Sequence, residues 1–138
     1  MLVPRDVPCP SCPYRLNCPS GVWHESEYQK LAQYDNDTAY QPVGVFMCHD
    51  AKDGSTICRG WLDVHPIGDL LALRLAATRG MISYELVDLP PSGVPVFESG
   101  AAAAEHGMAE IDDPSDPALR VIDKLTKRRA GQDGKVPD

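Results

Sequence analysis

Two cysteines spaced C-x2-C in a proline-rich stretch constrain the fold of this 138-residue chain more than any other feature. Cys9 and Cys12 stand within the first twenty residues, where five prolines exclude a helix. Such a stretch buries little apolar surface, so a metal ion held by the two thiolates would supply the missing stabilisation. A closed structural site needs four tetrahedral ligands, and Cys48 and Cys58 are the natural second pair.

A disulfide framework is the competing use of these cysteines. The chain has five cysteines, an odd number, and its first residues lack the apolar core of a secretory signal. No apolar stretch approaches the roughly 20 residues that cross a bilayer. We therefore expect a soluble, cytoplasmic, acidic protein with reduced thiols and no membrane contact.

The hydrophobic pattern predicts an α+β fold, a small single domain with a β-hairpin and the cysteine-rich loop beside three to four helices. The hairpin would pair residues 42–48 with residues 56–58 across the turn signal Asp53-Gly54. Helices are predicted over residues 27–34, 70–79, 100–106 and 118–129, with Ser26, Asp69 and Ser99 as N-caps and Gly80 as a stop. A flexible N-terminal arm (1–8), one metal-stapled domain (9–130) and a disordered tail (131–138) complete the expected organisation.

Four short motifs carry a resemblance to a known family. Cys9-Pro10-Ser11-Cys12-Pro13-Tyr14-Arg15, Pro19-Ser20-Gly21-Val22-Trp23, Phe46-Met47-Cys48-His49 and Cys58-Arg59-Gly60-Trp61 resemble an uncharacterised family of small actinobacterial and actinophage (bacteriophage) proteins. The resemblance spans roughly residues 9–107. It implies that Cys9, Cys12, Cys48 and Cys58 form the shared set and that Cys18 is peripheral, and it implies no reaction.

A narrower similarity concerns the cysteine loop alone. The run from Cys9 to Cys18, followed by Gly21-Val22-Trp23, is similar to the C-x2-C-P-x-R-x2-C run and Gly-Val/Ile-Trp turn of WhiB-like iron–sulfur regulators. Those regulators have a further upstream cysteine and a glycine pair after the tryptophan, and this chain has neither. The similarity implies that such a loop can hold an iron–sulfur cluster.

The metal itself follows from ligand chemistry. Four cysteines suit tetrahedral Zn²⁺, which we expect, and they also suit a [4Fe-4S] cluster, which is the alternative. Other side chains near the cysteines in sequence are candidates to replace a ligand or to contact one: Cys18, His49, His65, Arg15, Arg59 and Trp61.

No catalytic motif accompanies the cysteines, so we expect a non-catalytic regulatory or protein-interaction module. The alternative is a redox-active iron–sulfur or dithiol protein that transfers electrons or senses. With a net charge of −7 and one basic cluster at residues 124–129, the isolated domain is not expected to bind DNA. A protein partner is expected instead, through an aromatic surface around Trp23, Tyr28 and Trp61 if these are exposed.

Overall fold

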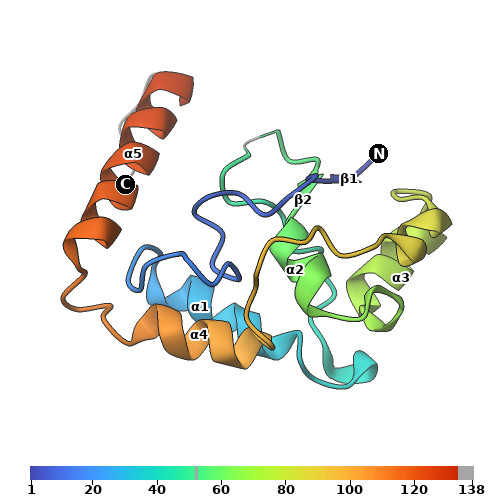
Figure 1. Ribbon diagram of the computed structural model, residues 1–138. Coiled ribbons are helices and arrows are strands. Elements are labelled where there is room, and N and C mark those ends of the chain that lie inside the picture. Colours follow the sequence, from blue (N-terminus) through green and yellow to red (C-terminus); the bar gives the residue numbers. More distant parts are fainter. Residues whose placement is uncertain (52, 134–138) are drawn as a thin grey trace.

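The structure, a computed structural model, describes the backbone of residues 1–51 and 53–133 and the side chains up to residue 128. Five α-helices dominate the described residues (Figure 1): α1 (Glu25–Gln33), α2 (Arg59–Val64), α3 (Leu71–Thr78), α4 (Gly100–Met108) and α5 (Asp116–Asp133). Short 3-10 turns lie at Thr38–Tyr40, Ile67–Asp69 and Tyr84–Asp88. The two strands are β1 (Val3–Pro4) and β2 (Thr56–Ile57). The fold is thus a small, mostly helical single domain with little strand.

The predicted β-hairpin is wrong. The sheet in the described residues has two strands, β1 and β2, and they run parallel, with Val3 opposite Thr56. The predicted first hairpin strand makes only an isolated antiparallel bridge, from Met47 to Ile57. Two effects explain this: β1 occupies an edge of β2, and α2 begins directly after Cys58, which limits the strand to two residues.

Helices α1 and α4 pack side by side because two glycines allow their backbones to approach closely (Figure 1). A Cβ atom at Gly100 would overlap the carbonyl oxygen of Leu31, and one at Gly107 would overlap the ring of Tyr28. Tyr28 and Leu31 are buried in this contact. The pairing therefore forms the base on which the cysteine loop lies.

Capping partly follows the predictions. Ser99 caps α4 as expected, since its hydroxyl accepts from the Ala102 amide at 3.0 Å. Gly80 ends α3 as predicted, with a positive φ of 72°. The cap predicted at Ser26 is wrong, because the His24 ring nitrogen accepts from the Ser26 amide and α1 begins at Glu25.

The cap predicted at Asp69 is also wrong. Asp69 closes a 3-10 turn, and α3 begins two residues later. The Leu71 amide donates instead to the side chain of Gln41 at 2.9 Å. A distant residue therefore caps this helix, and local sequence could not indicate it.

The structure differs from the predictions in the bounds of the two terminal segments. Residues 1–8, for which a flexible arm is predicted, contain β1, and the Leu2 amide also donates to the Met81 carbonyl at 2.8 Å. Helix α5 continues to Asp133, four residues past its predicted end. The rest of the predicted tail, residues 134–138, lies outside the described residues. Among the described helices, none is both long enough and apolar enough to cross a membrane.

Candidate metal centre

Four cysteine side chains from three separate segments meet in the interior. The sulfur atoms of Cys12 and Cys58 lie 3.7 Å apart. Cys9 interacts with both Cys12 and Cys48, and each of them shifts its pKa. The contacts therefore run in a chain from Cys48 through Cys9 and Cys12 to Cys58, and all four residues are buried.

Local structure explains why these thiols converge. The Cys12 amide donates to the Cys9 carbonyl at 2.9 Å, which closes a tight turn and turns both side chains the same way. The other pair is set by the bridge between residues 46–48 and β2: the Cys48 amide donates to Thr56, and the Cys58 amide donates to Phe46, each at 2.9 Å. This bridge brings Cys48 and Cys58, which are ten residues apart in sequence, close to the turn that holds Cys9 and Cys12.

Backbone amides point at three of the four sulfurs. The Trp61 amide donates to Cys58 Sγ at 3.4 Å, and the Tyr14 amide donates to Cys12. Cys48 accepts from the amides of the two residues at positions 50 and 51. Amide donors stabilise negative charge on sulfur, so this cradle suits thiolates bound to a cation.

Proximity and burial shift the thiols toward their neutral form. The hydrogen bond with Cys12, and then burial, raise the pKa of Cys9 to about 11. The pKa of Cys12 is raised well above its ordinary value, first by its hydrogen bond with Cys58. The pKa of Cys48 is raised by its hydrogen bond with Cys9 and by burial. These groups resist ionisation unless a cation displaces their protons.

The donor set fits a single tetrahedral ion in chemistry and partly in geometry. Among the described residues, no group of three or more His, Cys, Asp or Glu side chains is placed so that it could hold a metal ion. One edge does match, because Zn–S bonds of about 2.3 Å put tetrahedral sulfurs about 3.8 Å apart, and Cys12 and Cys58 are 3.7 Å apart. Completing the tetrahedron requires Cys9 and Cys48 to close on that edge.

Cys18 lies apart from this thiol chain. Its Sγ donates to the Ser11 carbonyl at 3.5 Å and to the Pro19 carbonyl at 3.7 Å. Burial raises its pKa to about 11. Cys18 therefore acts as a buried thiol donor that helps to shape the cysteine loop.

The two candidate histidines are engaged elsewhere. His49 Nε2 contacts Glu27 Oε2 at 2.8 Å, and its ring packs at a tilt of 51° against Trp23, with centroids 4.6 Å apart. His65 contacts the Trp61 carbonyl through Nδ1 at 2.8 Å and Asp35 through Nε2 at 2.9 Å. Neither histidine contacts the thiols through these nitrogens. His65 instead joins α2 to Asp35, which accepts from the first amides of α4.

Arg59 and Trp61 are structural neighbours of the centre. Arg59 is buried, and its guanidinium donates to Asp63 and to the carbonyls of Arg5, Asp6 and Pro90. Trp61 is fully buried, and its backbone amide donates to Cys58 Sγ. Arg15 pairs with Val96 through an isolated antiparallel bridge, and its Nε is buried without a partner in the described residues.

Two residues that the sequence reasoning missed touch the thiols. Arg5 Nη1 lies 3.9 Å from Cys48 Sγ, although its segment was expected to be a loose arm. Gly60 sits against the Cys12 sulfur, where any side chain would collide. Gly60 stands in the Cys58-Arg59-Gly60-Trp61 motif, but a lone glycine after a cysteine carried no usable signal.

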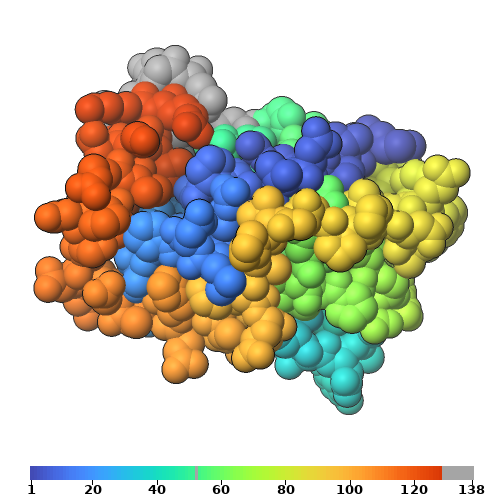
Figure 2. All heavy atoms as spheres, viewed as in Figure 1, coloured from blue at the N-terminus to red at the C-terminus, as the bar shows by residue number. Residues whose placement is uncertain are grey.

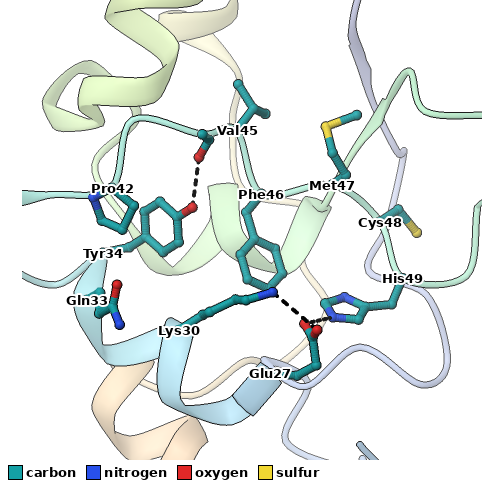
Figure 3. A pocket seen from close by; sticks show the side chains of 11 residues that line it. Glu27, Lys30, Gln33, Tyr34, Pro42, Val45, Phe46, Met47, Cys48 and His49 are labelled. Carbon is teal, nitrogen blue, oxygen red and sulfur yellow. Dashed lines mark hydrogen bonds and ion pairs between the residues drawn. The ribbon is translucent and has the colours of Figure 1, made fainter. Parts of the chain in front are cut away.

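A cavity of about 540 Å³ lies beside residues 44–49, the segment that contains Cys48 (Figure 3). The Glu27–His49 pair and Lys30 line one side, and Tyr34, Phe46 and other apolar residues line the rest. Glu27 contacts both His49, at 2.8 Å, and Lys30, at 3.2 Å. Cys48 contributes to the wall, but its sulfur points away from Phe46 (Figure 3). This cavity is therefore separate from the thiol cluster.

The predicted aromatic interaction surface is absent. Trp61, Tyr28 and Trp23 are all buried, and the most exposed of the three, Trp23, is 8% exposed. Trp23 instead anchors the cysteine loop, since its Nε1 donates to the Ser11 carbonyl at 2.8 Å. These aromatics stabilise the core around the thiols.

Comparison with known proteins gives a family and no activity. No curated protein matches the chain, and no solved structure matches it. One family matches residues 4–129, a range that includes all five cysteines, Arg5 and Gly60. The chain belongs to that family, DUF6283, a family of unknown function.

Proposed function

We propose that Cys9, Cys12, Cys48 and Cys58 bind one structural Zn²⁺ ion, and that the chain is a small, non-catalytic regulatory or protein-interaction module. The meeting of four buried thiols from three segments carries this proposal. A set of four cysteine ligands leaves no open coordination position for a substrate, as is typical of structural zinc. The ion would tie the cysteine loop to the Cys48 segment and to the start of α2.

The spacing of the sulfurs favours one ion over a cluster. In a [4Fe-4S] cluster each cysteine binds its own iron, so the cysteine sulfurs stand farther apart than they do around one ion. The 3.7 Å between Cys12 and Cys58 suits two ligands of the same ion. The similarity to WhiB-like regulators supports the iron–sulfur alternative, which is therefore kept as an outcome of the test.

A dithiol redox function receives less support. Reactive dithiols need a thiolate at neutral pH, which requires a lowered pKa. Here the pKa of Cys9 is raised to about 11, and that of Cys12 is raised as well. Metal coordination uses the same thiols without that requirement, because the cation displaces the protons.

Two charge pairs support the expectation that the isolated chain does not bind DNA. Lys127 pairs with Asp123 at 2.9 Å, and Arg128 pairs with Asp50. Both belong to the single basic cluster of an acidic chain. We therefore propose a protein partner, and weak binding to DNA at physiological salt.

Metal analysis of protein purified without oxygen tests the proposal. We expect about one zinc per chain, no visible colour, and the ligand-field bands of a tetrahedral thiolate complex after exchange with Co²⁺. Serine at Cys9, Cys12, Cys48 or Cys58 should abolish stoichiometric binding. Cys18→Ser is the matched control and should keep the zinc.

Other results would change or overturn the proposal. Four irons with sulfide and broad visible absorption would replace zinc with the cluster. A single iron would keep the four ligands and change the ion. A chain that holds no metal, or that loses it equally in Cys18→Ser and Cys12→Ser, would overturn the site.

A further inference from the structure

We infer that an ion network of Arg5, Asp50 and Arg128 couples metal binding at the cysteine centre to the docking of helix α5. This inference rests on the proposed function, because it needs an occupied centre. The network links three distant parts of the chain: the segment after β1, the loop after Cys48, and the C-terminal half of α5.

The first link joins the centre to Asp50. Amides at positions 50 and 51 donate to the Cys48 sulfur, so the loop backbone follows the position of that sulfur. Arg5 Nη1 lies 3.9 Å from Cys48 Sγ and 3.6 Å from Asp50 Oδ2. One guanidinium nitrogen thus lies within 4 Å of both the sulfur and the carboxylate oxygen, so the charge of each group acts on it.

The second link joins Asp50 to α5. The Asp50 carboxylate is only 12% exposed, and it also pairs with Arg128 Nη1. Ala118 and Leu125 are the buried residues of α5 among its described side chains, while Leu119 is half exposed. In Figure 1 α5 stands apart from the α1–α4 pair, and in Figure 2 it borders the segment coloured blue. The helix therefore packs on the rest of the chain through a narrow apolar strip, and the ion pair between Asp50 and Arg128 adds a contact nearer its C-terminal end.

The coupling follows from the charge of a coordinated sulfur. When Cys48 binds a cation its sulfur is a thiolate, which strengthens its hydrogen bonds to the loop amides and its attraction for Arg5. The loop then holds the Asp50 carboxylate in place for Arg128. Linkage is reciprocal, so docking of α5 must favour metal binding by the same factor by which metal binding favours docking.

Hydrogen exchange with and without zinc tests the inference in the full chain. In the zinc-loaded protein, Arg128→Gln should raise amide exchange in α5 roughly fivefold, the effect expected for one partly buried ion pair. It should leave exchange in α3 unchanged. It should also weaken zinc affinity by the same factor, measured by competition with a chromogenic chelator. Lys127→Gln is the matched control, since among the described residues the ion pair of Lys127 is with Asp123 of the same helix, at 2.9 Å.

The outcomes separate the two proposals because the zinc content is measured on the same samples. One zinc per chain with unchanged affinity and unchanged α5 exchange in Arg128→Gln would overturn the coupling and leave the metal site standing. Equal effects of Arg128→Gln and Lys127→Gln would also overturn it, since charge alone would then explain them. A chain without zinc would overturn both proposals.

Discussion

Gly60 packs directly against the sulfur of Cys12. A Cβ atom at Gly60 would lie 2.6 Å from that sulfur and 2.8 Å from the Tyr14 Cβ. The first turn of α2 therefore packs directly on the thiol cluster. The absence of a side chain at position 60 allows this contact, and the helix and the cysteine loop form one unit.

Gly60→Ala should consequently destabilise the protein. Alanine inside a helix normally stabilises by about 0.5–1 kcal/mol over glycine, whereas overpacking a rigid interior costs about 1–3 kcal/mol. Because backbone-linked atoms of Tyr14 block relief, we expect a net loss of about 1–2 kcal/mol, together with weaker zinc binding. Urea unfolding measures it. Gly44→Ala is the control, since no atom of the described residues lies within 4 Å of its Cβ position.

Cys12→Ser and Cys18→Ser should separate a ligand from a buried thiol. Loss of a zinc ligand removes binding free energy that is also folding free energy, so Cys12→Ser should lower the melting temperature by roughly 10 °C or more. A serine hydroxyl at position 18 can still donate to the Ser11 carbonyl, which Cys18 contacts at 3.5 Å, so the second variant should lose much less. Scanning calorimetry compares them, and similar small losses in both would mean that the thiols only fill space.

The charge of Glu27 should make the free energy of unfolding depend on pH in the acid range. Its hydrogen bond with His49, and then the charge of His49, lower the pKa of Glu27 from 4.5 to about 2. A lowered folded-state pKa means that this stabilisation is complete above pH 4.5 and is lost as the pH falls toward 2. We expect about 1 kcal/mol, after allowance for the partial exposure of Glu27.

The comparison of Glu27→Gln with Glu105→Gln isolates this effect. Glu27→Gln should be less stable than the parent at pH 6, and the difference should shrink below pH 4.5 and close near pH 2, by urea unfolding at each pH. Glu105, which is exposed on α4, should show no such convergence. A constant difference across the whole range would mean that Glu27 contributes through packing and not through its charge.

Arg59→Lys should be costly although it keeps the charge. Arg59 donates through Nε to Asp63 at 3.1 Å and through its two other nitrogens to three backbone carbonyls. A lysine reaches at most part of this planar set and leaves buried acceptors unpaired, so we expect a loss of about 2–4 kcal/mol. Arg79→Lys, at the exposed C-cap of α3, should change stability by less than about 0.5 kcal/mol in the same urea assay.

The sequence predicted the parts of this fold that local rules decide. Ser99 and Gly80 marked helix ends because a hydroxyl N-cap and a glycine with positive φ act within one turn. The grouping of Cys9 with Cys12 likewise follows from a tight turn. The choice of Cys48 and Cys58 as the second pair follows from the need for four ligands together with the family resemblance, and metal binding by this set stays a prediction.

The missed features depend on partners far away in sequence. The parallel pairing of β1 with β2 joins residues about fifty positions apart, and neither segment shows strand periodicity. Helix α2 was missed because its six residues follow directly on a strand and begin at a cysteine cap. Gln41 caps α3 from thirty positions away. In each case tertiary contacts outweigh the local pattern.

The contact of the cysteine loop with α4 has a consequence for the order in which the chain folds. The Ser20 hydroxyl donates to the Gly107 carbonyl at 3.0 Å and accepts from the Glu110 amide at 2.9 Å, across about ninety positions. Closing a loop of that length costs entropy that only the completed contacts repay, which slows folding. During synthesis on the ribosome the cysteine loop emerges early, yet it cannot reach its final position until residues 107–110 have left the exit tunnel.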